Sequence, residues 1–448
     1  MVVDRPVFDS PQYELRQAKV PHCLLVDGDP SWAVDREGLV ELDLTICDGR
    51  VTRIQPFDRE REASLAGPIH DCRGGQVWPC FIDGHTHLDK GHIWPRTPNP
   101  DGRFDSALAA VMADAEQYCS PEDVYLRLEF GLRCSYAQGT QAIRTHIDAA
   151  DRQAEISFGV FGELQRAWRD RLTLQAVCLV SLDYFMTPQG EKLADQMAEV
   201  GGILGGVGFN NPQLPAQVQQ LFKLAQDRGL DLDLHVDESD DPADTLLPLV
   251  AQTAMEMGYS GRLTCDHCCS LAVQSEDQQE KTIALVKAAG IHVISLPMCN
   301  LYLQDRQPSN QAHKTPFWRG ITLVHELKAA GVPVAFASDN CRDPFFGFGD
   351  HDMLEVWRES VRIAHLDQPY GDWPRSVTQT PAALMGLENR GLIGVGLPAD
   401  LILFQGRGFS ELLSRGQGDR IVLRRGKAID QTLPDYRELD GLLGVGDG

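Results

Sequence analysis

Residues 215–237, PAQVQQLFKLAQDRGLDLDLHVD, contain the unit whose repetition decides the fold: an amphipathic helix followed by a short apolar strand. Strand, loop and helix alternate in this way through most of the chain, which predicts parallel strands covered by helices. About eight such units favour a closed (β/α)8 TIM-type barrel over an open doubly wound sheet, which stays the alternative. The expected strands are residues 76–85, 140–148, 172–181, 201–209, 230–237, 262–268, 291–297 and 332–339.

The two ends of the chain have a different pattern. Short strand-like runs between turn residues fill the beginning, as in LVELDLTICDGRVTRI, and return near the end in ADLILF and RIVLRRGKAI. We expect residues 1–76 and 396–448 to combine into a small composite β-sandwich layer. Residues 77–395 then form the barrel.

The net charge of the chain limits the kinds of partner that it can bind. Its 448 residues include 64 Asp and Glu against 41 Lys and Arg, a formal charge of −23 that repels phosphate backbones and anionic lipids. No stretch approaches the roughly 18 apolar residues that span a bilayer, and residues 1–17 do not resemble a signal peptide. We therefore expect a cytoplasmic protein with reduced cysteines that binds neither nucleic acid nor membrane. The oligomeric state is left open, with a homo-oligomer as one alternative.

Side chains that can bind metal or carry protons gather where the expected strands end. In a barrel these ends converge on the active site, and two histidines separated by one residue on a strand point to the same side. One such histidine alone would be read as a core or surface residue. A set of five at successive strand ends indicates a metal centre: His85, His87, His235, His267 and Asp339. His146 and Glu238 also lie at strand ends.

Several motifs resemble the amidohydrolase superfamily, most closely its cytosine-deaminase-like branch, which includes hydrolases of amino-substituted triazines. The first is FIDGHTHLDKG (81–91), and the closing GLPADLILF (396–404) is similar to the return of that family to its β layer. Between them lie RTHID (144–148), HVDES (235–239), DHCCS (266–270), RGIT (319–322) and ASDNCRDPFFGFGDHDM (337–353).

The resemblance implies a ligand set and a number of ions. His85, His87, His235 and Asp339 would bind one divalent cation per chain, zinc or iron. Binuclear members of the superfamily use a carboxylated lysine after the fourth strand, where this chain has GFNNP (208–212). That difference favours a single metal.

The resemblance also implies catalytic roles, and general chemistry agrees with them. A cation held by imidazoles and a carboxylate lowers the pKa of a bound water from about 16 toward 7. Glu238 would carry the proton from this water to the substrate, His267 would hold the attacking oxygen or the tetrahedral centre, and Asp339 would accept from the water while binding the metal. The predicted reaction is hydrolytic deamination of a cytosine-like pyrimidine or related amino-heterocycle, a small molecule, with release of ammonia.

The substrate pocket departs from the family pattern. Cytosine deaminases present a Gln after the third strand, where this chain has Ser181. Asn340 and Arg342 follow the eighth strand and could bind polar edges of the ring. Four aromatic residues lie just beyond strands three and eight: Tyr184, Phe185, Phe345 and Phe346. Loop packing is their expected role; otherwise they could form a more apolar and roomier slot. We therefore predict that plain cytosine is at best a moderate substrate.

Two other functions remain open. The same centre could cleave an N-alkylamino substituent or a cyclic amide of a heterocycle. The chain could also be a catalytically silent scaffold that retains the barrel without an activity. An assay of ammonia release would distinguish deamination from these other cleavages. The metal content would distinguish a silent scaffold from an enzyme. The sequence assigns no role to His92, His146 or His351.

Overall fold

The computed structural model describes residues 7–26, 28–60, 67–307 and 314–444. The chain divides into two compact units, each built from three separate pieces. One unit comprises Met1–Ile82, Ser135–Gln141 and Asp352–Leu433, and the other Asp83–Cys134, Ala142–His351 and Pro434–Gly448. No helix among the described residues is both long and apolar enough to cross a membrane.

The first unit contains two small sheets. One has the order β3-β2-β1-β4, and the other, β16-β15-β14-β5, joins strands from both ends of the chain. Their bounds are β1 Gln12–Pro21, β2 Leu39–Cys47, β3 Arg50–Pro56, β4 Ile69–Asp71, β5 Val77–Pro79, β14 Leu401–Leu403, β15 Ile421–Arg424 and β16 Lys427–Ala428. Side chains of both sheets belong to one buried apolar cluster, which includes Leu15, Leu44, Val77, Leu401 and Leu423. Helices α10 (Met353–Ala364), α11 (Gln379–Leu384) and α12 (Phe409–Ser414) also lie in this unit.

The second unit has the α/β architecture with parallel strands that the alternation predicted. Its strands form the orders β6-β7-β8 and β13-β12-β11-β10-β9, and the pairs β7–β8 and β9 through β13 are parallel. Their bounds are β6 Phe81–Thr86, β7 Thr140–Asp148, β8 Thr173–Leu179, β9 Leu204–Val207, β10 Leu232–Val236, β11 Leu263–His267, β12 His292–Ser295 and β13 Val334–Phe336. The expected strand 76–85 is divided, because β5 belongs to the first unit's sheet and β6 begins after Cys80.

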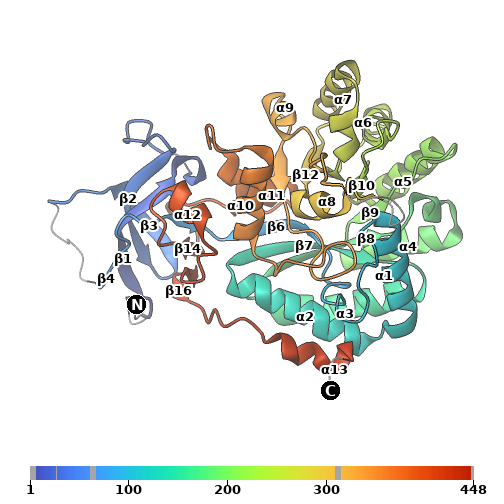
Figure 1. Ribbon diagram of the computed structural model, residues 1–448. Coiled ribbons are helices and arrows are strands. Elements are labelled where there is room, and N and C mark those ends of the chain that lie inside the picture. Colours follow the sequence, from blue (N-terminus) through green and yellow to red (C-terminus); the bar gives the residue numbers. More distant parts are fainter. Residues whose placement is uncertain (1–6, 27, 61–66, 308–313, 445–448) are drawn as a thin grey trace. The chain divides into compact units, whose positions relative to one another are not determined.

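Helices surround these strands in Figure 1. They are α1 Phe104–Tyr118, α2 Pro121–Ala137, α3 Arg152–Trp168, α4 Pro188–Val200, α5 Leu214–Arg228, α6 Leu246–Glu256, α7 Glu276–Ala288, α8 Pro297–Leu303, α9 Val324–Ala329 and α13 Asp440–Leu443. Helix α5 shows why the pattern works, since Val218, Leu221, Phe222 and Ala225 bury one face at helical spacing. The helix ends at Gly229, which has a φ of 64° and can adopt this left-handed conformation at little cost.

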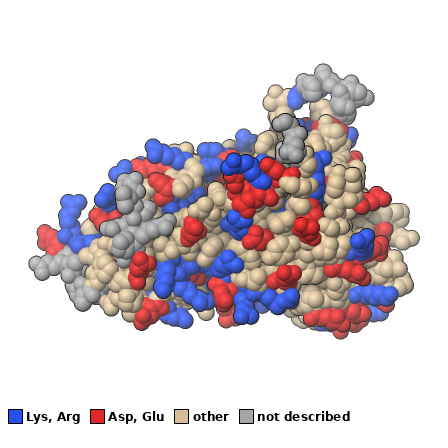
Figure 2. Space-filling model, turned by 90° about the horizontal axis from the view of Figure 1, so that it is seen from below, with Lys and Arg blue, Asp and Glu red and all other residues tan. Residues whose placement is uncertain are grey.

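Strand β10 places polar groups inside the unit. All five of its residues are buried, and side chains alternate along a strand. Leu232, Leu234 and Val236 therefore share one face, while Asp233 and His235 share the other. The second face holds the site described below. On the molecular face drawn in Figure 2, basic and acidic side chains are interspersed rather than gathered by sign.

Candidate metal centre and active site

Four buried side chains converge at the ends of three strand segments. His85 and His87 come from the end of β6, His235 from β10, and Asp339 from the segment after β13, where a φ of 61° turns the chain. An isolated parallel bridge between Thr86 and Asp339 brings the first and last of these segments together. The side chains are at most 6% exposed.

The donor atoms of this group have the spacing of metal ligands. His87 Nε2 lies 3.3 Å from His85 Nε2, 3.4 Å from His235 Nε2 and 3.3 Å from Asp339 Oδ1, and His85 Nε2 is 3.3 Å from the same oxygen. Ligands about 2.1 Å from a tetrahedral zinc lie about 3.4 Å from one another. His85, His87 and Asp339 thus place their donor atoms within 4.8 Å of one another, a spacing that suits one small divalent cation, and His235 adjoins the group through His87.

The electrostatics of the group also suit a cation. Burial holds the pKa values of His87 and His235 well below the usual range, so both imidazoles are neutral and have a free electron pair for a metal. Burial opposes ionisation of Asp339, but hydrogen bonds with His85 and His87 lower its pKa well below the usual value. Burial also disfavours charge on His85, yet Asp266 and Asp339 raise its pKa to about 10. The buried Asp339 carboxylate thus creates a demand for positive charge at this point, whereas burial raises the pKa of Asp266 well above its usual value.

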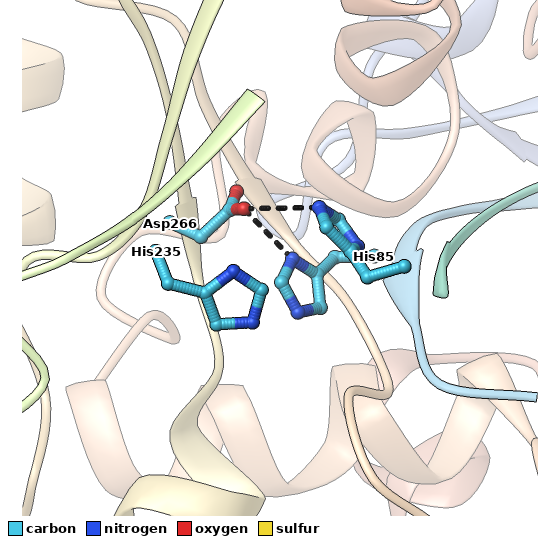
Figure 3. A group of neighbouring side chains, drawn as sticks. His85, His235 and Asp266 are labelled. Carbon is cyan, nitrogen blue, oxygen red and sulfur yellow. Dashed lines mark ion pairs between the residues drawn. The ribbon is translucent and has the colours of Figure 1, made fainter. Parts of the chain in front are cut away.

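Asp266 of β11 contacts two histidines beside the centre, His85 and His146. Its Oδ2 lies 2.9 Å from His85 Nδ1 and 3.5 Å from His146 Nε2, the two ion pairs drawn in Figure 3. A carboxylate on Nδ1 fixes the ring so that Nε2 faces the centre. His146 Nε2 is also 3.1 Å from Asp233 Oδ1, and Asp233 Oδ2 accepts from Arg144 at 2.6 Å.

These supporting residues were missed by the sequence reasoning. Asp266 precedes His267 in a strand whose five residues are all buried. A signal was available, because a charged residue inside an apolar strand needs a buried partner. Arg144 and Asp233 carry the same signal on β7 and β10.

Glu238 and His267, the predicted proton carrier and its neighbour, lie together beside the cluster. His267 Nδ1 is 3.3 Å from Glu238 Oε1, and the amide of Asn300 in α8 donates to the same oxygen at 3.1 Å. Burial, and after it the Asp339 carboxylate, raises the pKa of Glu238 well above its usual value. A carboxyl group in this environment readily holds a proton, as a general acid–base residue must. Asn300 was not among the predicted residues, since α8 gives no polar pattern to mark it.

A cavity of about 730 Å³ opens onto the cluster. Metal-centre residues His87, His235 and Asp339 form part of its wall, together with Glu238 and His267. The remaining wall is largely apolar and aromatic and includes Phe104, Leu108, Val111, Met112, Ile156, Leu179, Val180, Tyr184, Val207, Phe209 and Phe345. A second cavity of about 440 Å³ shares Phe104, Val207, Phe209, His235 and Glu238 with the first.

The structure brings two of the three predicted substrate-binding residues to this cavity. Ser181 lines it, and its hydroxyl hydrogen-bonds Asp183. Asn340 also lines it, and its amide donates to Asp343 at 2.7 Å. Arg342 does not line either cavity, because its guanidinium lies over the Tyr436 ring, 4.3 Å from the centroid.

The aromatic residues divide in the same way. Tyr184 and Phe345 line the cavity, whereas Phe185 and Phe346 are buried and are not part of its wall. The two that line it make part of an apolar wall, which was the alternative reading. The other two have the packing role that was expected first.

Lys90 and Asp148 form a polar pair in the cavity wall that was not predicted. Lys90 Nζ donates to Asp148 Oδ1 at 2.8 Å and lies 5.5 Å from the centre of the Phe345 ring. Both residues lie inside motifs quoted above, Lys90 three residues after His87 and Asp148 two residues after His146. Position after a strand end was therefore an available signal for both.

Comparisons with known proteins agree with this geometry. The family model described as amidohydrolase family matches residues 129–420. A pterin deaminase of Rhizobium rhizogenes is 51% identical over 439 residues, covering 98% of each chain. An N-isopropylammelide isopropyl amidohydrolase of Pseudomonas is 25% identical over 373 residues, covering 81% of this chain and 86% of the relative. The crystal structure of 5-methylcytosine deaminase from Klebsiella pneumoniae with 5-fluorocytosine superposes with a TM-score of 0.78 at 26% identity, covering 94% and 98% of the two chains.

Fold and site together define a metal-dependent hydrolase. The chain belongs to the amidohydrolase family. It acts on carbon–nitrogen bonds other than peptide bonds and deaminates an amino-heterocycle by hydrolysis. The resemblance inferred from the motifs is thereby confirmed.

Proposed function

We propose that the substrate is a pterin, a fused two-ring heterocycle, whose exocyclic amino group is released as ammonia. The observation that carries this proposal is the 730 Å³ cavity, which extends from the metal cluster along an apolar and aromatic wall. A second fused ring would lie against this wall, where a single pyrimidine would leave it in contact with water. The 51% identical pterin deaminase supports the same substrate class.

We also propose the number and the ligands of the catalytic ion. One zinc or iron ion is held by His85, His87, His235 and Asp339, and when bound it lowers the pKa of a water molecule and polarises it for attack. The donor atoms of His85, His87 and Asp339 at 3.3 Å from one another support this set, and His235 Nε2 lies 3.4 Å from His87 Nε2. The absence of a lysine in residues 208–212 supports a single ion at this centre.

Protein side chains then transfer the protons of the reaction. Water oxygen forms a bond to the ring carbon that bears the amino group. Glu238 takes a proton from this water and delivers it to the ring nitrogen. The proton of the new hydroxyl group then passes to the amino group, whose bond to carbon breaks to release ammonia while the hydroxyl oxygen becomes the ring carbonyl. Asn300 holds Glu238 in place, while His267 hydrogen-bonds the tetrahedral centre. Ser181 and Asn340 are proposed to hydrogen-bond polar edges of the ring; Arg342 would need to leave Tyr436 to do so.

A further proposal concerns the architecture of the chain. We infer a closed eight-stranded (β/α)8 barrel over residues 77–395, with residues 1–76 and 396–448 as a composite β-sandwich. Isolated parallel bridges support closure, since Thr86 pairs with Asp339 while Val177 and Ser181 pair with Ile203 and Val207. The apolar cluster common to the two terminal sheets supports the sandwich. All twelve cysteines are free, which supports a reducing compartment such as the cytoplasm.

Steady-state kinetics test the substrate. Zinc-loaded protein is expected to release ammonia from pterin with a kcat/KM above about 10⁴ M⁻¹s⁻¹, and above its value for cytosine, because the second ring gains apolar contacts. A coupled ammonia assay with pterin, cytosine, 5-methylcytosine and N-isopropylammelide measures this, with Glu238→Gln as the inactive control. No ammonia from pterin, or a higher kcat/KM for cytosine, would contradict the proposal. Release of isopropylamine as the main activity would favour cleavage of alkylamino groups instead.

A further inference from the structure

A second group of potential metal ligands lies apart from the catalytic cluster. His92, Cys341 and His351 each place one donor atom within 4.8 Å of the other two. All three side chains are buried, with exposed fractions of 1–2%. None of them lines either cavity around the catalytic cluster, so substrate binding does not explain their presence.

The two imidazoles repeat the spacing of the catalytic ligands. His92 Nε2 and His351 Nε2 are 3.3 Å apart, as are the Nε2 atoms of His85 and His87. A single shared proton could also join two neutral imidazoles at this distance. That hydrogen bond, however, gives no role to the thiol of Cys341, whose sulfur completes the group.

The backbone around the group is held in unusual conformations. His92 and His351 have φ values of 65° and 55°, in the left-handed region that non-glycine residues rarely adopt. The N–H of His92 donates to the carbonyl of Cys341 at 3.0 Å, so the loop after β6 and the loop after β13 are already joined here. Strained residues persist only where surrounding interactions fix them, and a bound ion is one such interaction.

The chemistry of the donors selects the ion. Two nitrogens and one sulfur suit zinc, which binds imidazole at about 2.0–2.1 Å and thiolate at about 2.3 Å. Burial lowers the pKa of His351 to about 4 and holds that of His92 well below its usual value, so both rings are neutral and able to bind a metal. Cys341 would bind such an ion through its thiolate sulfur.

We propose that His92, Cys341 and His351 bind a second zinc ion, which has a structural role and joins the loops after β6 and β13. This ion is additional to the catalytic one, bringing the content of the chain to two. Because Cys341 lies two residues after Asp339, the second ion would also restrain the segment that carries a catalytic ligand. The proposal does not depend on which heterocycle is deaminated.

Cobalt(II) replacement tests the site without any measurement of activity. Full-length protein loaded with cobalt is expected to hold about two ions per chain and to show a thiolate-to-cobalt charge-transfer band in the near ultraviolet. Cys341→Ser should abolish the band and reduce the content to about one ion. Since serine can disturb a buried loop, His351→Asn serves as a second variant and should also lose one ion.

The matched control is Cys299→Ser. Cys299 is buried, and its sulfur lies 3.8 Å from the Phe345 carbonyl and in a group with Glu238 and Asp339. If the band came from a thiol near the catalytic ion, this variant would remove it and overturn the proposal. A wild-type protein with one cobalt and no band, or a band unchanged in both Cys341→Ser and His351→Asn, would also overturn it. Retention of the band in Cys299→Ser together with its loss in Cys341→Ser supports the second site.

Discussion

Glu238 and His235 both line the cavity, and the tasks proposed for them differ. His235 Nε2 is one of the converging donor atoms, whereas Glu238 is held by Asn300 and His267. A ligand and a proton carrier respond differently to substitution, since only the first changes metal content. Replacement of each residue can therefore separate the two roles.

Glu238→Gln is expected to keep the catalytic metal and lose roughly 10²–10⁴-fold in kcat, the range for removal of a positioned proton carrier. His235→Ala should instead lose the ion from this centre. Elemental analysis beside ammonia-release kinetics measures both effects. If Glu238→Gln remained folded but lost its ion, Glu238 would be a ligand rather than the proton carrier.

At the residue scale, the sequence predicted side chains that the structure brings together, but not those that orient them. His85, His87, His235, Glu238 and Asp339 each end a strand segment or follow it closely, and fold class alone brings such positions together. The pairing of His85 with Asp266 depends on which strands face each other across the interior. The position of Arg342 depends on Tyr436, a residue far away in the chain, which no local pattern encodes.

At the scale of elements, the strands β7, β10 and β11 carry a buried ionic layer beneath the metal cluster. Arg144 donates to Asp233, which also contacts His146, and Asp266 lies between His146 and His85. Arg144, Asp233 and Asp266 are each at most 1% exposed. Charges in such a layer are tolerated only because each has a partner.

Asp233→Asn is expected to lower the free energy of unfolding by about 3–5 kcal/mol, because the Arg144 guanidinium would remain buried without its counter-charge. Asp231→Asn on the same segment is the control. Its partner Arg262 is half exposed, so its loss should cost below about 1 kcal/mol. Urea denaturation of the three proteins measures the difference, and equal stabilities of the two variants would show that the buried pair adds nothing.

The periodicity of the sequence predicted the helices and strands well, except where one apolar run contains two strands that belong to different sheets. Residues 76–85 look like a single strand, but β5 pairs with β14 and β6 lies beside β7. Both strands are apolar and buried, so hydrophobicity does not mark the break at Cys80. The choice between sheets depends on partners more than fifty residues away.

On the scale of the whole molecule, the chain returns to its second unit near the end. Helix α13 and the turn before it bury Leu439 and Leu443 against Phe130 and Cys134 of α2. Arg133 and Glu438 form an ion pair at the same contact, and Tyr436 stacks on Phe130 with ring centres 5.6 Å apart. This contact holds Tyr436 where it covers Arg342.

Leu439→Ala is expected to destabilise the protein by about 2–5 kcal/mol, the usual cost of a large-to-small change at a buried leucine. Leu442→Ala, a partly buried neighbour, should cost less. Thermal or urea unfolding of both variants measures the effect. A Leu439→Ala protein as stable as the wild type would mean that the contact between α13 and α2 does not contribute to folding.

The pairing of β5 with β14 has a consequence for synthesis on the ribosome. Val77 and Trp78 of β5 are fully buried in the finished sheet. Roughly 320 residues separate Pro79 from Leu401, so at about 5–20 residues per second the nascent chain waits roughly 20–60 s for the partner strand. During that time an apolar strand has no hydrogen-bonding partner on the β14 side, which makes the growing chain a candidate client for chaperones. An incomplete chain released before residue 401 would keep that edge open and would be prone to aggregation.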